Sequence, residues 1–278
     1  MKTLRNAAGR KISSTGLGGE GVLRTYGRTG EAQAVIRSAV EGGITYYDSA
    51  QAYSDSEIYY GGIWQEEPSL RRTIFQTSKS AARLKEPALT ELQNSLRRLH
   101  TDYLDLWQIH DVRTEKDLHE ISGPGGALEA FVEAKNKGLV RHIGVTGHHD
   151  PAVLTRAVRD WPVDTVLLPV NPVEGILGGF LTDTLHAAAK KEIAVIGMKV
   201  MGGGHYILPK LGISATDLIR YALVFDISLP IVGCASPAEV RTLVSAAESG
   251  PLSRDEMTAL EEKFRPYAPK MAYYRGVW

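Results

Sequence analysis

The sequence predicts a (β/α)8 barrel, a TIM barrel, with a short N-terminal β-hairpin that caps the bottom of the barrel. Between about residue 15 and residue 248, short apolar runs alternate with amphipathic stretches. Parallel strands need crossover connections of this length, and eight such units in ~250 residues close into a barrel. No proline-rich or serine-rich linker divides the chain, so we expect one domain over residues 1–278.

Local signals support each unit of this alternation. The hairpin is predicted from two runs, 4–9 and 11–14, around an Ala8-Gly9-Arg10 turn. Thr29 can cap a helix that Gly42-Gly43 ends, and the clearest helix carries leucines at 89, 92, 96 and 99. Further helices are expected from about 54, over 127–137, after 150, over 177–190, from 214, over 236–248 and near 254–264, with a loop at 111–126. The expected strands are 15–19, 44–48, 73–79, 104–110, 141–146, 165–168, 194–198 and 229–232.

Composition narrows the class of protein. The 32 basic and 32 acidic residues cancel, which gives no reason to expect nucleic acid or a membrane surface as partner. Cys234 is the only cysteine, so neither an intramolecular disulfide nor a cysteine zinc cluster is expected. The start lacks the apolar core of a signal peptide, and no apolar run approaches the ~20 residues of a membrane span. We therefore expect a cytoplasmic protein without a metal site.

Three consecutive strands are predicted to end in ionisable side chains. Strand two ends in Asp48, with Tyr53 in the loop that follows, strand three ends in Lys79, and strand four ends in His110. The carboxyl ends of barrel strands surround one cavity, where active sites of this fold lie. We therefore expect these four side chains to converge there.

Together these residues suit proton donation to a carbonyl oxygen. A free phenol has a pKa of about 10 and is a poor acid at neutral pH. A nearby ammonium would lower that pKa, and a carboxylate would hold the ammonium in place. A neutral histidine could orient the carbonyl by a hydrogen bond. Each residue alone has an ordinary structural explanation, and it is their joint placement that favours catalysis.

Several segments resemble the aldo-keto reductase family, in a divergent prokaryotic-type branch. Residues 48–57, Asp-Ser-Ala-Gln-Ala-Tyr with Ser56-Glu57 after it, resemble the signature D-[TS]-A-x-x-Y-x-x-S-E. Four more segments, in the family's order, are similar to its motifs: Thr77-Ser78-Lys79, 95–103, 104–110 and 138–146. The resemblance runs over nearly the whole chain and includes the opening hairpin.

The resemblance implies NADPH-dependent reduction of an aldehyde or ketone, or the reverse oxidation. Tyr53 would be the general acid, Asp48 and Lys79 its tuning pair, and His110 the residue that orients the carbonyl. The segments that would hold the nicotinamide nucleotide follow the remaining strands. The expected cofactor-binding residues are Gly19, Thr146, Gly147, Asn171, Met198, Lys199, Met201, Gly202, Gly233, Cys234 and Ser236.

Three departures bear on the cofactor. Leu167 and Met198 stand where family members usually have a glutamine and an aromatic residue, and Glu239 stands where an arginine usually binds the 2′-phosphate. NADPH is expected from the family, and NAD remains the alternative.

Two other functions fit the same barrel. One is a Schiff-base aldolase or isomerase that uses Lys79 or Lys199, because barrels host many chemistries. The other is a nicotinamide-nucleotide-sensing protein with little turnover. Substrate choice would depend on residues 111–126, 201–212 and the tail, where Tyr273, Tyr274 and Trp278 either cover the substrate site or seal the side of the barrel.

Overall fold

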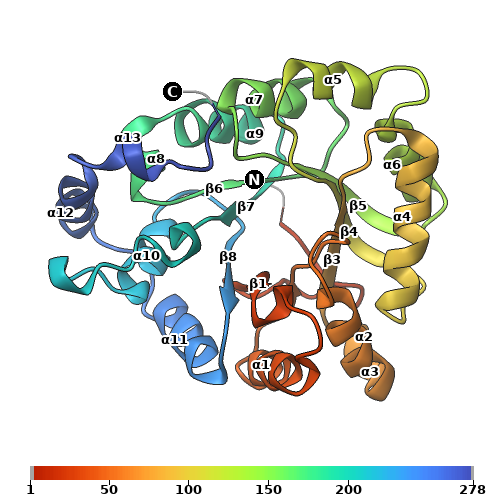
Figure 1. Ribbon diagram of the computed structural model, residues 1–278, viewed down its shortest axis with the longest axis horizontal. Helices are drawn as coiled ribbons and strands as arrows, with labels where there is room; N and C mark the ends of the chain where they lie inside the picture. The colour runs from red at the N-terminus through yellow and green to blue at the C-terminus, as the bar shows by residue number, and fades with distance from the viewer. Residues whose placement is uncertain (1–2, 277–278) are drawn as a thin grey trace.

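Eight parallel strands form a closed barrel in which each strand pairs with its neighbours in sequence and β8 pairs with β1 (Figure 1). This computed structural model describes residues 3–276, so Trp278 of the predicted tail lies outside the described residues. The strands are β1 (Gly16–Gly21), β2 (Tyr46–Tyr47), β3 (Phe75–Ser80), β4 (Leu104–Ile109), β5 (Val140–Thr146), β6 (Thr165–Pro169), β7 (Ala194–Met198) and β8 (Leu229–Cys234). The predicted TIM barrel is confirmed.

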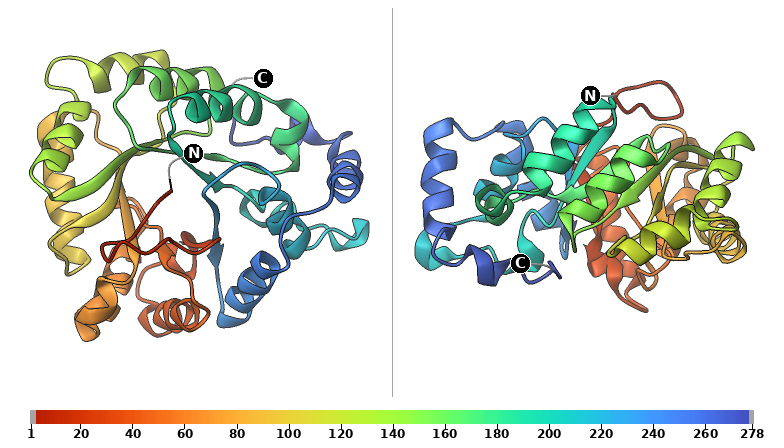
Figure 2. Two further views of the ribbon diagram at one scale, coloured as in Figure 1. Left: turned by 180° about the vertical axis from the view of Figure 1, so that it is seen from behind. Right: turned by 90° about the horizontal axis from the view of Figure 1, so that it is seen from above.

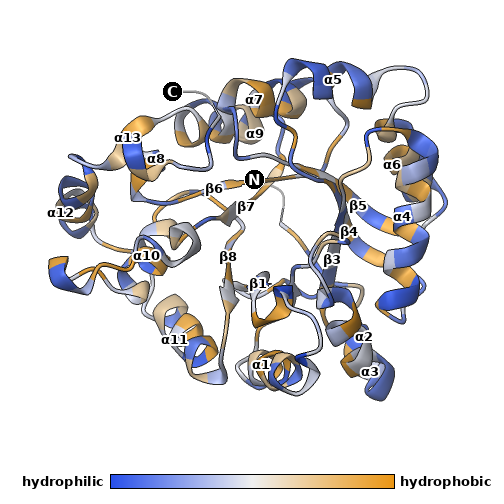
Figure 3. Ribbon diagram, viewed as in Figure 1, coloured by the Kyte–Doolittle hydropathy of each residue, from blue (hydrophilic) through white to orange (hydrophobic). Residues whose placement is uncertain are grey.

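Helices surround the strands on the outside of the barrel (Figure 1). The α-helices are α1 (Thr29–Glu41), α2 (Ser56–Glu66), α3 (Pro68–Arg71), α4 (Lys85–Arg98), α5 (Glu115–Ser122), α6 (Ala127–Asn136), α7 (Pro151–Asp160), α8 (Pro172–Leu177), α9 (Leu185–Lys190), α10 (Ala215–Ala222), α11 (Pro237–Glu248), α12 (Arg254–Phe264) and α13 (Ala268–Met271). Short turns of other helix types are η1 (Val22–Arg24), η2 (Phe180–Thr184), η3 (Gly202–Gly204) and η4 (Pro209–Leu211). Figure 3 shows hydrophobic residues along β6 and hydrophilic residues on α4 and α5. No helix among residues 3–276 is both long enough and apolar enough to cross a membrane.

The hairpin closes the end of the barrel at which the strands begin. Arg5 and Lys11 form an antiparallel bridge around the turn. Leu4 and Ile12 are buried in one apolar cluster with side chains from the strand starts, such as Phe75. In a side view the hairpin lies on the opposite face from the last described residues of the chain (Figure 2). The predicted cap at the barrel bottom is therefore confirmed, and the other face is the mouth.

Two predicted segments differ from the structure. The helix expected over 177–190 is wrong, because α8 begins at Pro172 and the chain then breaks at Gly178 and Gly179, whose φ angles are 71° and 85°. Such φ angles end a helix and favour glycine. The loop expected over 111–126 contains α5, which a capping box begins: Thr114 accepts the N–H of Asp117, and Asp117 accepts that of Thr114.

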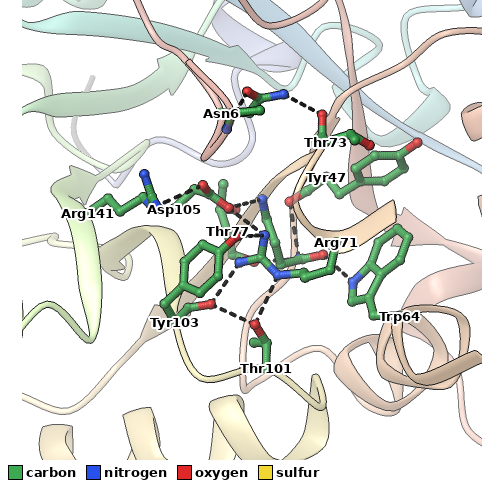
Figure 4. A network of polar contacts seen from close by, with 12 residues as sticks. Asn6, Tyr47, Trp64, Arg71, Thr73, Thr77, Thr101, Tyr103, Asp105 and Arg141 are labelled. Carbon is green, nitrogen blue, oxygen red and sulfur yellow. Dashed lines mark hydrogen bonds and ion pairs between the residues drawn. The ribbon is translucent and has the colours of Figure 1, made fainter. Parts of the chain in front are cut away.

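A buried arginine joins the strand starts at the bottom of the barrel (Figure 4). The guanidinium of Arg71 donates to the carboxylate of Asp105 at 2.8 Å, to the carbonyl of Tyr103 at 2.8 Å and to the hydroxyl of Thr101 at 3.1 Å. The same carboxylate oxygen accepts the backbone N–H of Gln76 at 3.0 Å. The arginine is 5% exposed and the aspartate 0%. This network ties α3 to the first residues of β3 and β4.

Candidate active site

The four residues predicted to be catalytic lie together at the mouth, at the carboxyl ends of β2, β3 and β4. Lys79 donates from Nζ to Oδ2 of Asp48 at 2.6 Å. The ring of Tyr53 lies with its centroid 4.6 Å from that ammonium nitrogen. The His110 ring meets the Tyr53 ring edge-on, with centroids 5.5 Å apart. The ring of the phenol therefore contacts both the ammonium and the imidazole.

The Asp48–Lys79 pair is buried, and both side chains make a further hydrogen bond besides the one that joins them. Lys79 is 1% exposed and Asp48 2% exposed. Besides the aspartate, the ammonium donates to the carbonyl of Ser49 at 2.7 Å, and the second carboxylate oxygen accepts the hydroxyl of Thr77 at 2.9 Å. Burial lowers the pKa of Lys79, and the carboxylate opposes that change. A buried pair with this many partners has one fixed geometry.

Tyr53 is held by a close approach of β1. A Cβ atom built on Gly19 would lie 2.7 Å from Cδ2 of Tyr53 and 2.9 Å from the carbonyl oxygen of Asp48. Only glycine leaves room for the phenol ring at this position. The predicted role of Gly19 in cofactor binding remains a prediction, while its contact with the tyrosine is direct.

The pKa of Tyr53 shifts in the direction opposite to the one expected. Burial raises it well above its ordinary value, and the carboxylates of Asp48 and Glu20 raise it further, whereas the guanidinium of Arg24 opposes them. The expected lowering by Lys79 is wrong, because burial dominates. A phenol with a raised pKa keeps its proton at neutral pH, and only the protonated form can donate.

His110 is neutral at the pH of most assays. Burial lowers its pKa to about 3, and the positive charge of Lys79 contributes to that shift. A neutral imidazole can donate one hydrogen bond to a substrate oxygen without giving up its proton.

The low pKa of His110 predicts a pH-dependent stability. The unfolded chain binds a proton below a pKa of about 6.5, which the folded protein does not bind until the pH approaches 3. Stability should therefore fall as the pH drops, by roughly 2 kcal/mol between pH 7 and pH 5 from this group. The variant His110→Asn should lose this part of the dependence of the free energy of unfolding on pH. Urea unfolding of both proteins at pH 7 and pH 5 measures this dependence. An equal loss of free energy of unfolding in both proteins would contradict the low pKa of His110.

Two further charged groups at the mouth were not identified from the sequence. The guanidinium carbon of Arg24 lies 4.9 Å from the centroid of the Tyr53 ring. Beyond His110, Asp111 pairs with His148 at 3.4 Å and with Arg113. No sequence pattern distinguishes these residues from other charged residues in loops.

The residues expected to bind the cofactor after β5 lie beside this charged group. The hydroxyl oxygen of Thr146 accepts the N–H of Asp111 at 2.8 Å. Gly147 packs so closely that a Cβ built on it would lie 2.9 Å from the carbonyl oxygen of Val112. Within residues 3–276 the Thr146 hydroxyl accepts this hydrogen bond and donates none.

Asn171 has its side chain committed to other parts of the fold. Its Oδ1 accepts the N–H of Glu174 as the cap of α8, and its Nδ2 donates to the carbonyl of Lys199 at 3.1 Å and to the hydroxyl of Tyr274 at 3.0 Å. Tyr274 in turn donates to Glu174 at 2.8 Å. The tail therefore docks on the β6–α8 and β7–η3 segments, with His148 also contacting the tail.

The remaining predicted cofactor residues lie on β7, on β8 and in the segments that follow them. Met198 packs on the apolar cluster inside the barrel, Met201 is half-buried, and the carbonyl of Gly202 accepts the hydroxyl of Tyr273 at 3.0 Å. On the other side, Gly233 packs against Glu20 of β1, and burial raises the pKa of the Cys234 thiol to about 12, which leaves it protonated.

The N-terminus of α11 already holds a carboxylate. Ser236 caps this helix by accepting the N–H of Glu239. The carboxylate of Glu239 accepts the N–H of Ala235 at 2.7 Å. Helix N-termini attract anions, and here an anion from the chain itself is bound.

No group of three or more His, Cys, Asp or Glu side chains within residues 3–276 is arranged to hold a metal ion.

Comparison with known proteins identifies the family. Residues 16–207 match the Aldo/keto reductase family, and the chain belongs to it. An NADP(+) aldo-keto reductase of Schizosaccharomyces pombe is 27% identical over an alignment of 210 residues. The alignment covers 69% of this chain and 59% of that protein, so the chain spans about three fifths of the length of this relative. Two solved structures share the fold. An aldo-keto reductase from Bacillus halodurans is 20% identical, with 94% of this chain and 96% of that chain covered at a TM-score of 0.74, and one from Klebsiella pneumoniae in complex with NADPH is 21% identical, with 95% of both chains covered at 0.71.

Proposed function

We propose that this protein reduces an aldehyde or ketone to the alcohol with NADPH, or catalyses the reverse oxidation. The observation that carries the proposal is the contact of Tyr53 with both the Lys79–Asp48 pair and His110 at the barrel mouth. Family membership and the NADP(+) in the name of the yeast relative support the same reaction.

The proposed roles follow from the protonation states. NADPH, when bound, supplies the hydride. The neutral His110 donates a hydrogen bond to the carbonyl oxygen and orients it beside the phenol of Tyr53. As negative charge develops on that oxygen, the phenol gives it a proton. Lys79 then stabilises the phenolate that remains, and Asp48 keeps the ammonium in position.

The residues around the mouth fit NADPH on one side more than on the other. On the β7 side, Lys199 has no ion-pair partner among the described residues, so its ammonium suits a phosphate group. The Thr146 hydroxyl donates no hydrogen bond within the described part of the chain, so it can donate to an amide or ribose oxygen. At the N-terminus of α11, Glu239 occupies the backbone donor that a 2′-phosphate would use.

A cofactor titration followed by a substrate panel tests the proposal. NADPH should quench tryptophan fluorescence saturably, and its absorbance at 340 nm should fall when an aldehyde or ketone is added. Tight NADPH binding with no oxidation by any carbonyl compound would favour the nucleotide-sensing function. Absence of NADPH binding, together with borohydride trapping of a carbonyl substrate on a lysine, would favour the Schiff-base function.

Glu239 should weaken the binding of NADPH more than the binding of NADH. In the variant Glu239→Gln the negative charge at the helix N-terminus is lost, and a 2′-phosphate no longer meets an anion there. At an exposed position this is expected to lower the dissociation constant of NADPH about threefold to tenfold. The dissociation constant of NADH, which lacks that phosphate, should change less than twofold, and equal changes for both would contradict the assignment. Fluorescence titration with each nucleotide measures the difference.

The cytoplasmic location stays a prediction from the sequence.

A further inference from the structure

Arg24 lies at the rim of the mouth, next to the proposed proton donor. It is the last residue of η1, directly after β1, and its guanidinium carbon is 4.9 Å from the centroid of the Tyr53 ring. Its side chain is 47% exposed. A cation is thus held within reach of any compound whose carbonyl oxygen meets the phenol.

Most of the hydrogen-bonding capacity of Arg24 is free. Only Nη1 has a partner among the described residues, the carboxylate of Glu20 at 2.8 Å. Both members of that pair are about half-exposed and four residues apart, and such pairs contribute little to stability. A guanidinium has five N–H donors and binds a carboxylate through two of them at once. An anion from solution can therefore bind beside Glu20 or replace it.

The other cations near the phenol are committed. The Lys79 ammonium is buried on Asp48, and Arg113 holds Asp111 through both Nε and Nη2. Lys199 is the group proposed above for the cofactor phosphates. His110 is neutral, because its pKa is about 3. Arg24 is thus the cation available to a substrate in the described part of the mouth.

We propose that the physiological substrate is an oxo acid, an aldehyde or ketone that also carries a carboxylate, and that Arg24 binds this carboxylate. The proposal rests on the proposed function, since the carbonyl oxygen is taken to lie on Tyr53 and His110. Glu20 acts as the internal competitor for the guanidinium. A substrate without an anionic group gains nothing from Arg24 and leaves the Glu20 pair intact.

Two matched substrates test the proposal. 4-Carboxybenzaldehyde and methyl 4-formylbenzoate carry the same aldehyde, but only the first is an anion at pH 7. The ratio of kcat/KM for the acid to kcat/KM for the ester should fall about tenfold to a hundredfold in Arg24→Gln, which is the effect of losing a charged hydrogen bond. The variant Arg24→Lys should recover part of the ratio. The variant Glu20→Gln should raise it, because the competing carboxylate is gone.

Arg28→Gln is the matched control. Arg28 belongs to the same loop and is exposed and paired with Glu31, so its loss should leave the ratio within twofold. An equal fall of kcat/KM for both substrates in Arg24→Gln would overturn the proposal, because Arg24 would then act only on the Tyr53 phenol. If the wild type reduces the ester and the ratio of the two kcat/KM values is the same in Arg24→Gln as in the wild type, the proposed substrate class alone would be overturned. A wild type that reduces no carbonyl compound with either nicotinamide nucleotide would overturn the proposed function itself.

Discussion

Replacing Tyr53 with phenylalanine is expected to lower kcat for carbonyl reduction by roughly a hundredfold to ten-thousandfold, the usual contribution of a positioned general acid. The substitution removes one hydroxyl and keeps the ring that packs on Gly19 and His110. The fold and the Lys79–Asp48 pair should therefore survive. The dissociation constant of NADPH should change less than twofold, because the ring that contacts Gly19 is kept and the other proposed cofactor residues lie on β5 to β8 or in the segments that follow them. Steady-state assays at 340 nm and fluorescence titration measure the two effects.

Tyr26→Phe is the matched control for this loss. Tyr26 lies in the loop between β1 and α1 and is 77% exposed, so the removal of its hydroxyl should leave kcat within twofold. Turnover of the Tyr53→Phe protein at the wild-type rate would mean that another group supplies the proton. A parallel loss of NADPH binding would instead indicate that the phenol supports the cofactor site.

The fold could be predicted because its signals are local and repeated. Each strand and most helices carry their own apolar pattern, and the order of these patterns allows few topologies. The helix expected over 177–190 failed because apolar periodicity continues through Gly178 and Gly179, where the backbone leaves helical φ. The Thr114–Asp117 capping box is a sequence pattern that predicts the start of α5.

The catalytic residues could be proposed because the barrel frame brings consecutive strand ends together. Strand boundaries that are right within a residue or two are enough to place Asp48, Lys79 and His110 at the mouth. The direction in which the pKa of Tyr53 shifts could not be predicted, because it depends on burial, which is a property of the whole mouth. The position of Arg24 depends on the turn of η1, which no pattern predicts.

Asn171 illustrates why cofactor residues are harder to predict than catalytic ones. An amide side chain before a proline is equally typical of a helix cap and of a ligand contact. Here the cap and the tail use its side chain fully. The pattern Asn171-Pro172 therefore predicts the start of α8 at least as well as it predicts a nucleotide contact.

The second large effect concerns the bottom of the barrel. Replacing Arg71 with alanine leaves the Asp105 carboxylate buried, with the N–H of Gln76 as its remaining short hydrogen bond. Burial already raises the pKa of this carboxyl despite the guanidinium. Breaking a buried pair on one side is expected to lower the free energy of unfolding by about 3–5 kcal/mol, measured by urea denaturation at pH 7.

The loss of free energy of unfolding caused by replacing Arg71 should depend on the charge of Asp105 and on pH. The double variant Arg71→Met with Asp105→Asn should recover much of the loss, because no charge then stays buried. Arg141→Ala is the control: this arginine is 44% exposed and 3.8 Å from the other carboxylate oxygen, so its removal should cost at most about 1 kcal/mol. In Arg71→Ala the folded state binds a proton at Asp105 more readily than the unfolded chain does, so its deficit should shrink as the pH falls. A deficit that is small, or independent of pH, would mean that water or Arg141 compensates the carboxylate, and that the strand starts do not depend on Arg71.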